Sequence, residues 1–263
     1  MLVEQIWTGN DYRNFNYLIA CPETGEALAI DPLAHELCLA AARERGWQIT
    51  QILNTHEHFD HIGGNAPLAA ATGARILAHA NARDSIQDMD RGLQAGDVVR
   101  VGRSVELLVL DTPGHTMSHV CLLSKTEQPA LFSGDTLFNA GAGNCHHGGH
   151  PEQLYRTFVE QLARLDAGTR IYPGHDYITN NLQFTLDREP DNQAARDLLG
   201  RIEGQDPAHP LVTSLGLEKE VNTFFRLQSP TVIAQLRAAF PELDEDPDPE
   251  MVFLKLRELR NRW

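Results

Sequence analysis

The sequence predicts an α+β protein in which helices cover the sheets and a helical C-terminal region follows. Short β-like runs alternate with helical segments over residues 1–175, and polar clusters repeatedly follow the apolar runs. After about residue 176 the β-like runs nearly vanish and helical segments take their place. Polar loops at the ends of buried strands are a common place for a functional site. We therefore expect a site-bearing domain over residues 1–175 and a helical C-terminal region over residues 176–263.

Alternating polarity and turn residues place the elements of the first domain. A Glu-Thr-Gly sequence over residues 23–25 fits a hairpin turn, and Gly46 fits the end of a helix. The strand over residues 48–54 runs directly into a histidine-rich stretch. The expected strands are residues 2–8, 15–20, 26–31, 48–54, 74–80, 105–112, 119–124, 129–135 and 169–173. The expected helices are residues 34–45, 66–72 and 151–165.

The rest of the chain is expected to be helical at about residues 177–187, 190–203, 217–226, 229–239 and 247–262. Along the last helix an apolar stripe is expected from Val252, Leu256, Leu259 and Trp263. Arg257 and Arg260 are three residues apart and share a neighbouring face. Two interpretations remain open for these arginines. They form either a solvated helix end that complements the helix dipole or a binding site for an anionic ligand.

The composition is that of a globular protein and excludes some functions. The 263 residues are 42% hydrophobic and 22% charged, with a formal net charge of −14. So acidic a chain is a poor nucleic-acid binder, and its first residues lack the pattern of a signal peptide. No apolar stretch reaches membrane-spanning length, and the four cysteines lack framework spacing. We expect a cytoplasmic protein with free thiols and without membrane or nucleic-acid partners, and its oligomeric state stays open.

Seven residues with metal-binding side chains stand at the ends of expected strands. The stretch THEHFDH (55–61) supplies four of them, and TPGHT, SGDT and YPGH supply one each. They are His56, His58, Asp60, His61, His115, Asp135 and His175. On an extended strand Asp60 and His61 would point to opposite faces, and on a helix His56 and His58 would diverge by about 200°. We therefore expect a compact loop that directs the side chains of THEHFDH inward.

Seven ligands are too many for one tetrahedral zinc ion. They fit two divalent ions that share a carboxylate and a water molecule. Isolated histidines are more often solvated surface residues, and we interpret His35, His79 and His209 in that way. The sequence thus predicts a centre of two metal ions, with zinc as the first choice and iron or manganese as alternatives.

These motifs, in this order, resemble the metal-binding motifs of the metallo-β-lactamase superfamily. The resemblance implies a four-layer αββα sandwich with the metal ions at the edge of its sheets. It also implies which residues bind each ion. One ion would be held by His56, His58 and His115, the other by Asp60, His61 and His175, and Asp135 would bridge both.

Within the superfamily the chain is most similar to glyoxalase II, the hydroxyacylglutathione hydrolases. Its SGDTLFNAGAG resembles the family's GDTLF-x-x-G-x-G, and its GHDYITNNLQF resembles GHEYT-x-x-NL-x-F. The ending LRELRNRW is similar to the family's glutathione-binding helix. The resemblance implies a thioesterase that splits S-(2-hydroxyacyl)glutathione, above all S-D-lactoylglutathione, into glutathione and a 2-hydroxy acid during methylglyoxal detoxification. It assigns glutathione binding to Tyr177, Arg257 and Arg260.

The chain departs from glyoxalase II just after this G-x-G motif. The family continues with a lysine and aromatic residues that contact glutathione, whereas Asn144, Cys145 and His146 follow here. A lost charge-assisted contact costs about 1.5–3 kcal/mol. We expect Asn144 and His146 at the substrate, and a thiol carrier other than glutathione is an alternative. His146, His147 and His150 either shape the pocket or are solvated loop residues.

The expected chemistry follows from the charges of the centre. Two divalent ions outweigh the negative charges of Asp60, Asp135 and a bridging hydroxide, so the centre stays positive. The hydroxide would attack the thioester carbonyl, and a thiolate with a pKa near about 8.5 leaves without a strong general acid. Asp60 and Asp135 are therefore the expected catalytic residues.

Three other interpretations remain. A sulfur dioxygenase of the persulfide type shares the fold but uses one iron ion held by two histidines and an aspartate, and we expect it to lack the long helical tail. Lactonases or thioesterases of the same fold, acting on a substrate without glutathione, are the next alternative. A binding module without turnover belongs to another class, and the complete ligand set disfavours it.

Overall fold

The computed structural model describes all 263 residues, which group by contact into two compact units. The first unit comprises residues Met1–Thr112, Ser118–Gly134 and Tyr172–Asp176. The second comprises residues Pro113–Met117, Asp135–Ile171 and Tyr177–Trp263. The units are groups of contacts, so the domain boundary expected between residues 175 and 176 stays a prediction.

A mixed six-stranded sheet in the order β1-β2-β3-β4-β5-β6 organises the first unit. Its strands are β1 (Leu2–Trp7), β2 (Phe15–Ala20), β3 (Glu26–Ile30), β4 (Gln48–Leu53), β5 (Arg75–His79) and β6 (Met89–Leu93). The first three are antiparallel neighbours, and the pairs from β3 to β6 are parallel. Parallel neighbours need a crossover connection, and helices supply it between β3 and β4 and between β4 and β5.

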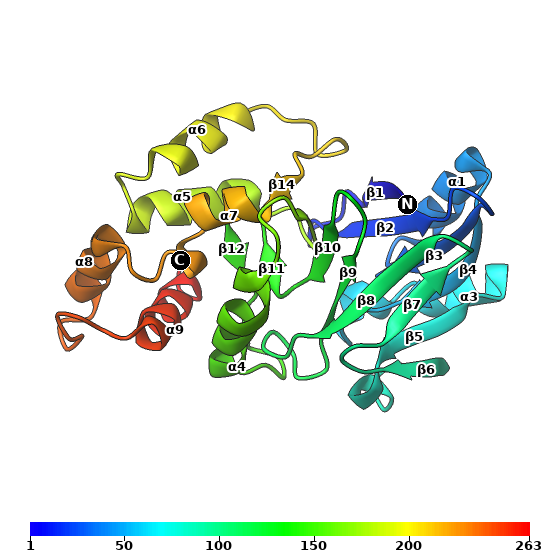
Figure 1. Ribbon diagram of the computed structural model, residues 1–263, viewed down its shortest axis with the longest axis horizontal. Helices are drawn as coiled ribbons and strands as arrows, with labels where there is room; N and C mark the ends of the chain where they lie inside the picture. The colour runs from blue at the N-terminus through cyan, green and yellow to red at the C-terminus, as the bar shows by residue number, and fades with distance from the viewer. The chain divides into compact units, whose positions relative to one another are not determined.

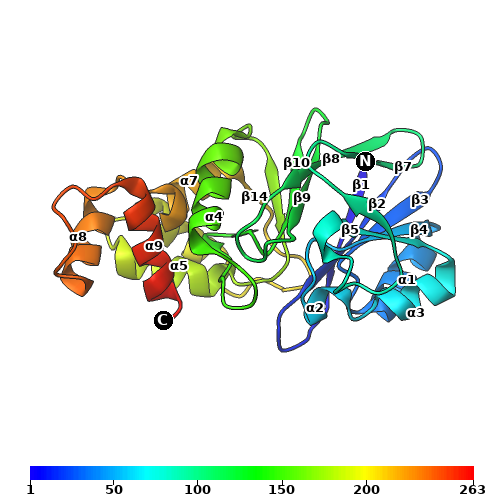
Figure 2. The ribbon, with the colours of Figure 1, turned by 90° about the horizontal axis from the view of Figure 1, so that it is seen from below.

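These helices cover one face of the first sheet, as Figures 1 and 2 show. They are α1 (His35–Arg45), α2 (Phe59–Ile62), α3 (Asn65–Thr72) and the 3₁₀ turn η1 (Ala80–Ala82). Gly46 ends α1 in the left-handed conformation, as the sequence predicts. Leu18, Ile52 and Leu68 belong to the apolar cluster between sheet and helices. Every residue of β2 is buried, which is typical of a central strand with layers on both faces.

A second, antiparallel set of strands lies against the other face of the first sheet. It comprises β7 (Val98–Val101), β8 (Val105–Asp111), β9 (Val120–Ser124) and β10 (Ala130–Gly134). The ring of Tyr17 on β2 meets the ring of Phe132 on β10 edge to face, with centroids 5.5 Å apart. Phe132 in turn stacks on Tyr172 at 5.0 Å. The first unit is therefore a sandwich of two sheets with helices outside the first.

The second unit is mainly helical. Its strands are the hairpin β11 (Leu137–Phe138) and β12 (Gly141–Ala142), with β14 (Thr213–Ser214) paired to the start of β13 (Arg170–Pro173). Its helical segments are α4 (Pro151–Arg156), η2 (Thr157–Gln161), η3 (Leu162–Arg164), α5 (Ile178–Arg188), α6 (Gln193–Arg201), α7 (Leu215–Val221), η4 (Thr223–Phe225), α8 (Pro230–Ala239) and α9 (Pro249–Arg260). Ile178, Leu182, Leu198 and Val221 belong to an apolar cluster that joins α5, α6 and α7.

The α+β class is confirmed, and the differences from the sequence prediction are local. Strands β6 and β7 were not expected, because MDRGL is mostly polar and VVRV is only four residues long. The helix expected over residues 151–165 changes from α to π to 3₁₀ geometry along its length. His79 is buried, not solvated, and accepts a hydrogen bond from the backbone of Asn81. Trp263 is 47% exposed and does not complete the buried stripe of α9.

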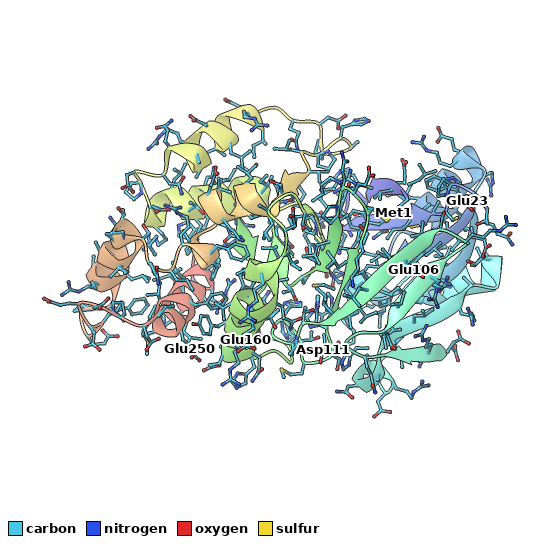
Figure 3. The ribbon with its side chains drawn as sticks, viewed as in Figure 1. Met1, Glu23, Glu106, Asp111, Glu160 and Glu250 are labelled. Atoms are coloured by element: carbon cyan, nitrogen blue, oxygen red, sulfur yellow. The ribbon has the colours of Figure 1, made fainter.

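Acidic side chains lie on the surface of both units. Glu23 and Glu106 of the first unit and Glu160 of the second are exposed and are labelled in Figure 3. They contribute to the net charge of −14. Among the helices, none has both the length and the apolar character that a membrane span requires.

A partly buried ion pair joins the end of α5 to the segment before α8. Glu189 accepts hydrogen bonds from Nε and Nη2 of Arg226 at 2.5 and 2.7 Å. Ser229 Oγ and Asn192 Nδ2 donate to the same carboxylate at 2.6 and 2.7 Å. Burial raises the pKa of Glu189, but these hydrogen bonds outweigh it and leave the pKa below its usual value.

Glu189→Gln removes the charge from this pair, and we expect the free energy of unfolding to fall by about 1–3 kcal/mol near neutral pH. A carboxyl with a lowered folded-state pKa stabilises the fold above its unfolded-state pKa of about 4.3. That stabilisation is lost as the pH falls through the folded-state pKa. Urea unfolding at a series of pH values should therefore show the gap between wild type and variant closing in acid.

If the difference in the free energy of unfolding between wild type and Glu189→Gln stayed constant down to about pH 3, the charge of Glu189 would not be its cause. Glu258→Gln is the matched control, because the ion pairs of Glu258 with Lys255 and Arg262 lie on the surface. Its effect should stay below about 1 kcal/mol.

Candidate metal centre and substrate cavity

The histidine-rich loop of the first unit begins where β4 ends. Asn54 Nδ2 donates to the carbonyl oxygen of His61 and to Asn65 Oδ1, both at 3.1 Å. The short helix α2 begins at Phe59, so Asp60 and His61 leave the extended path of the preceding residues. The loop is therefore compact, as its spacing predicts.

Five of the seven expected ligands come together within the first unit. The ligand atoms of Asp60, His61 and His175 all lie within 4.8 Å of one another. His56 Nε2 lies 3.1 Å from His58 Nδ1, and the rings of His56 and His61 are 4.0 Å apart. Imidazole nitrogens and a carboxylate oxygen gathered in this way are a donor set for a divalent cation.

Buried oxygens determine which nitrogen of these histidines points to the centre. Asp31 Oδ2 accepts from His61 Nδ1 at 3.0 Å and from Thr55 Oγ1 at 2.7 Å. The backbone oxygen of Tyr12 accepts from His175 Nδ1 at 2.7 Å. Because Nδ1 carries the proton in each ring, Nε2 is the atom of both that would bind a metal ion. Asp31 also accepts from the Thr55 amide at 2.8 Å, and it holds a left-handed φ of 48°.

Asn14 fixes the carboxylate of the same group. Its Nδ2 donates to the side-chain and backbone oxygens of Asp60, both at 3.1 Å. Asn10 donates to Asn14 Oδ1 at 2.9 Å and so fixes the orientation of the amide. Next to it, Arg13 pairs with Asp176 at 2.5 Å, which holds this hairpin loop against the residue that follows His175.

Sequence analysis missed three residues of this environment. Asp31 stands at the end of the strand expected over residues 26–31, as the expected ligands stand at the ends of other strands. Its carboxylate could therefore have been recognised as part of the site from sequence. Asn14 carries no comparable sign, because its role depends on a hairpin meeting a distant loop. His119, assigned only to a strand, is buried and stacks on the ring of His56 at 5.2 Å.

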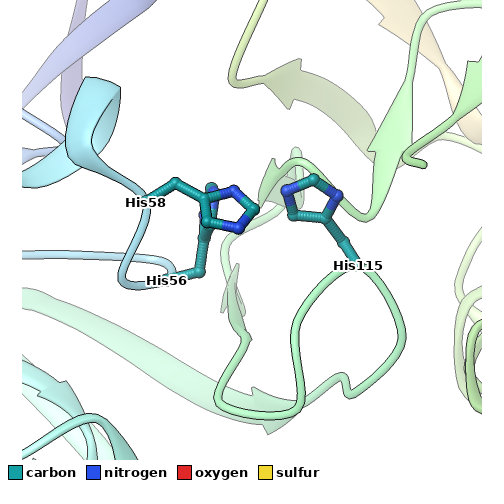
Figure 4. A group of neighbouring side chains, drawn as sticks. All are labelled: His56, His58 and His115. Atoms are coloured by element: carbon teal, nitrogen blue, oxygen red, sulfur yellow. The ribbon is translucent and has the colours of Figure 1, made fainter. Parts of the chain in front are cut away.

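The other two expected ligands, His115 and Asp135, belong to the second unit. His115 Nδ1 donates to the backbone oxygen of Asn144 at 2.6 Å. Its Nε2 lies 3.6 Å from Asp135 Oδ2. Figure 4 draws His115 on the loop after β8, and His56 and His58 on the loop after β4. His115 thus follows the same rule as the ligands of the first unit: Nδ1 is used in a hydrogen bond and Nε2 faces a carboxylate.

All five residues expected at the substrate line one cavity of about 200 Å³ in the second unit. They are Asn144, His146, Tyr177, Arg257 and Arg260. Phe138, Ala142, Asn181 and Asn261 complete its wall. The structure therefore brings together residues from three separate motifs of the sequence.

Two arginines make this cavity positive. Arg257 is 5% exposed, which excludes the solvated helix end for this residue. Burial and, to a smaller extent, the neighbouring Arg260 lower the pKa of Arg257 to about 10, against the opposite effect of Cys145. Burial also lowers the pKa of Arg260, against the opposite effect of Tyr177. Both side chains remain cationic near neutral pH, so the cavity suits an anionic ligand.

The loop that departs from the family motif has ordinary local structure. Asn144 Oδ1 accepts from the His146 amide at 3.1 Å, which closes a small turn. Burial raises the pKa of the Cys145 thiol to about 11, so this residue is not an activated nucleophile. His147 and His150 are exposed, and His150 pairs with Glu152 at 2.7 Å.

Comparison with known proteins agrees with this arrangement. Residues 18–175 match the Metallo-beta-lactamase superfamily, and residues 176–263 match the Hydroxyacylglutathione hydrolase C-terminus. A hydroxyacylglutathione hydrolase from Nitrosococcus oceani is 66% identical over 263 residues, 100% of both chains. ETHE1 from Myxococcus xanthus has a similar structure, with a TM-score of 0.68, 26% identity and coverage of 99% of this chain and 98% of that chain. TTHA1623, solved in a di-iron-bound form, has a TM-score of 0.57 and 26% identity, and covers 82% of this chain and 96% of that chain.

The fold and the gathered ligands are those of a metallo-hydrolase of the metallo-β-lactamase superfamily, which confirms the expected αββα class. Within that superfamily the chain belongs to the hydroxyacylglutathione hydrolase family. Membership confirms an enzyme of the thioester hydrolase type that uses metal ions.

Asp31→Asn would place a donor amide against the donors of Thr55 and His61. We expect metal affinity to fall by about tenfold or more, since His61 loses the acceptor that fixes its ring. Competition between the protein and a chromophoric chelator for Zn²⁺ measures this affinity.

Asp111→Asn is the matched control for Asp31→Asn. Asp111 also pairs with a buried histidine of the first unit, His79 at 3.4 Å, but neither residue belongs to the ligand set. The control should bind Zn²⁺ like the wild type. An equal loss of Zn²⁺ affinity in Asp31→Asn and Asp111→Asn would show that Asp31 has no specific role in orienting His61.

Proposed function

We propose that this protein hydrolyses S-D-lactoylglutathione to glutathione and D-lactate. One observation carries the proposal: the side chains expected to bind glutathione line a single cationic cavity. Glutathione has carboxylates that such a cavity can bind through charge-assisted hydrogen bonds. The names of its relatives point to the same substrate class.

We propose a centre of two divalent ions built from seven side chains. His56, His58 and His115 would hold one ion, Asp60, His61 and His175 the other, and Asp135 would bridge them. The donor set supports this, because His61, His115 and His175 all use Nδ1 in hydrogen bonds that direct Nε2 to a carboxylate. Zinc is the first choice, because it prefers imidazole and carboxylate ligands, and iron and manganese accept the same atoms.

The chain's own residues orient the reactants around this centre. The ions, when bound, favour hydroxide over water and attract the negative charge that develops on a thioester carbonyl. Asp60 and Asp135 are the catalytic carboxylates, since they offset part of the cationic charge and hold the geometry of the centre. Tyr177, Arg257 and Arg260 bind the thiol carrier and so position the scissile bond. Since a thiolate with a pKa near about 8.5 is a good leaving group, no dedicated general acid is required.

The cavity loop allows glutathione without the family lysine. Asn144 and His146 line the cavity where the lysine and an aromatic residue are missing. The two arginines retain positive charge there. We also propose a small-molecule substrate, no nucleic-acid or membrane partner, and a cytoplasmic location, where the thiols of the four cysteines stay reduced.

A persulfide dioxygenase is the second candidate. Residues 176–263 match the Hydroxyacylglutathione hydrolase C-terminus, which favours the hydrolase over this candidate. The metal content would also distinguish the two activities. One iron ion held by two histidines and an aspartate supports the dioxygenase, whereas two ions and seven ligands support the hydrolase.

The test is hydrolysis of S-D-lactoylglutathione by protein whose metal content has been counted. We expect a kcat/KM of about 10⁴ M⁻¹s⁻¹ or more. Asp135→Ala should lose this activity together with bound metal. No turnover by protein with two ions bound would reject the substrate, and a single iron ion with persulfide oxidation would establish the dioxygenase.

Arg260→Ala tests whether glutathione is the thiol carrier. We expect KM for S-D-lactoylglutathione to rise by about ten- to a hundredfold, because a buried charge-assisted contact is lost. For S-D-lactoyl-N-acetylcysteamine, which lacks the glutathione carboxylates, KM should not change. Lys255→Ala is the control, since Lys255 lies on the same helix but pairs with Glu258 outside the cavity. Equal effects of Arg260→Ala on both thioesters would mean that the cavity does not recognise glutathione.

A further inference from the structure

Arg257 does more than line the cavity. Its Nη1 donates to the backbone oxygens of Ala142 at 2.7 Å and Gly143 at 3.0 Å. Its Nε donates to Asn261 Oδ1 at 3.0 Å, and its guanidinium lies 5.5 Å from the centroid of the Phe224 ring. These contacts fix the direction of the side chain. The cation on α9 therefore holds the backbone that follows β12.

This backbone leads directly to the oxygen that orients His115. The next carbonyl in the chain, that of Asn144, accepts from His115 Nδ1 at 2.6 Å. Gly143 packs against the same group: a Cβ added there would lie 1.8 Å from the backbone oxygen of Asp135 and 3.1 Å from His115 Nδ1. A small displacement of residues 142–144 would therefore move both the ring of His115 and the backbone of Asp135.

The preceding residues are held by other buried side chains of the C-terminal region. Glu218 Oε2 accepts from the Ala140 amide at 2.7 Å, and Asn222 Nδ2 donates to the Gly141 oxygen at 3.0 Å. Asn181 Nδ2 donates to the oxygen of Asn139 at 2.9 Å. Together with Arg257, these side chains hold the backbone from Asn139 to Gly143. The two carbonyls that Arg257 holds are those immediately before Asn144.

We propose that Arg257 is a positioning residue for the metal ligand His115, acting through the carbonyls of Ala142 and Gly143 on the carbonyl of Asn144. The proposal rests on the assignment of His115 as a ligand under the proposed function. Arg260 supplies a contrast within the same cavity, because it donates to Asn181 at 3.2 Å and not to residues 142–144. Arg257 thus serves the metal centre as well as the substrate, whereas Arg260 reaches this segment only through Asn181, at Asn139.

Metal affinity of the full-length apoprotein separates these roles. Zn²⁺ is titrated in competition with a chromophoric chelator for the wild type and for Arg257→Ala, Arg257→Lys, Arg260→Ala and His115→Ala. We expect Arg257→Ala to weaken the binding of one ion by about tenfold or more, as loss of an outer hydrogen bond to a ligand does. Arg257→Lys keeps one donor and should lose less. Arg260→Ala should bind both ions like the wild type.

The Co²⁺-substituted protein gives a second readout that does not depend on turnover. The visible bands of Co²⁺ report the geometry of its ligands, and Arg257→Ala should change the bands of one ion only. Glu189→Gln controls for general loss of stability. It breaks the ion pair between Glu189 and Arg226, which belongs to the same unit but lies far along the chain from residues 142–144.

Wild-type Zn²⁺ affinity in a folded Arg257→Ala protein would overturn the proposal if His115→Ala loses an ion. Equal losses in Glu189→Gln and Arg257→Ala would also overturn it, because the effect would then reflect stability alone. If His115→Ala itself keeps both ions, the assignment of His115 under the proposed function fails, and this inference fails with it. The two failures are thus distinguishable.

Discussion

The geometry of the candidate site depends on hydrogen bonds from Nδ1 of three candidate ligand histidines to backbone and carboxylate oxygens. His61 donates to Asp31, His175 to the backbone of Tyr12, and His115 to the backbone of Asn144. Each bond fixes a tautomer and the plane of a ring, and so decides where Nε2 points. Two of the three acceptors are backbone oxygens, so the folding of loops outside the metal motifs controls the geometry of the donor set.

This dependence explains two constraints on the backbone near the candidate ligands, at Asp31 and at Gly143. Asp31 has a φ of 48°, and its carboxylate is held by the amide and hydroxyl of Thr55. Gly143 has no room for a Cβ, because the backbone of Asp135 fills that space. A left-handed φ is disfavoured for a residue other than glycine, and Asp31 keeps it because the surrounding hydrogen bonds outweigh the local cost. Both constraints lie beside candidate donors whose direction depends on them.

The candidate donors could be recognised from sequence because THEHFDH places four of them within one loop and each of the other three follows an apolar strand. The α+β class followed from the alternation of β-like runs with helical segments. The residues that orient the donors were not predictable, since Asn14 reaches Asp60 only after a hairpin and a loop meet. Strands β6 and β7 escaped detection because charged residues interrupt their apolar pattern. Periodicity reports burial, whereas hydrogen bonds between distant loops leave no pattern in the sequence.

The backbone and the side chain of Asn144 face different parts of the second unit. The carbonyl of residue 144 orients His115, and any residue type provides that carbonyl. The side chain of residue 144 lines the cavity instead. Under the proposed function, a substitution at this position would therefore alter recognition of the thiol carrier while it preserves the acceptor for His115. Gly143, by contrast, is constrained by the backbone of Asp135 and allows no such exchange. Gly143 and Asn144 are thus neighbours under different constraints. Gly143 is limited by the backbone of Asp135, whereas the side chain of residue 144 can change without loss of the carbonyl that orients His115.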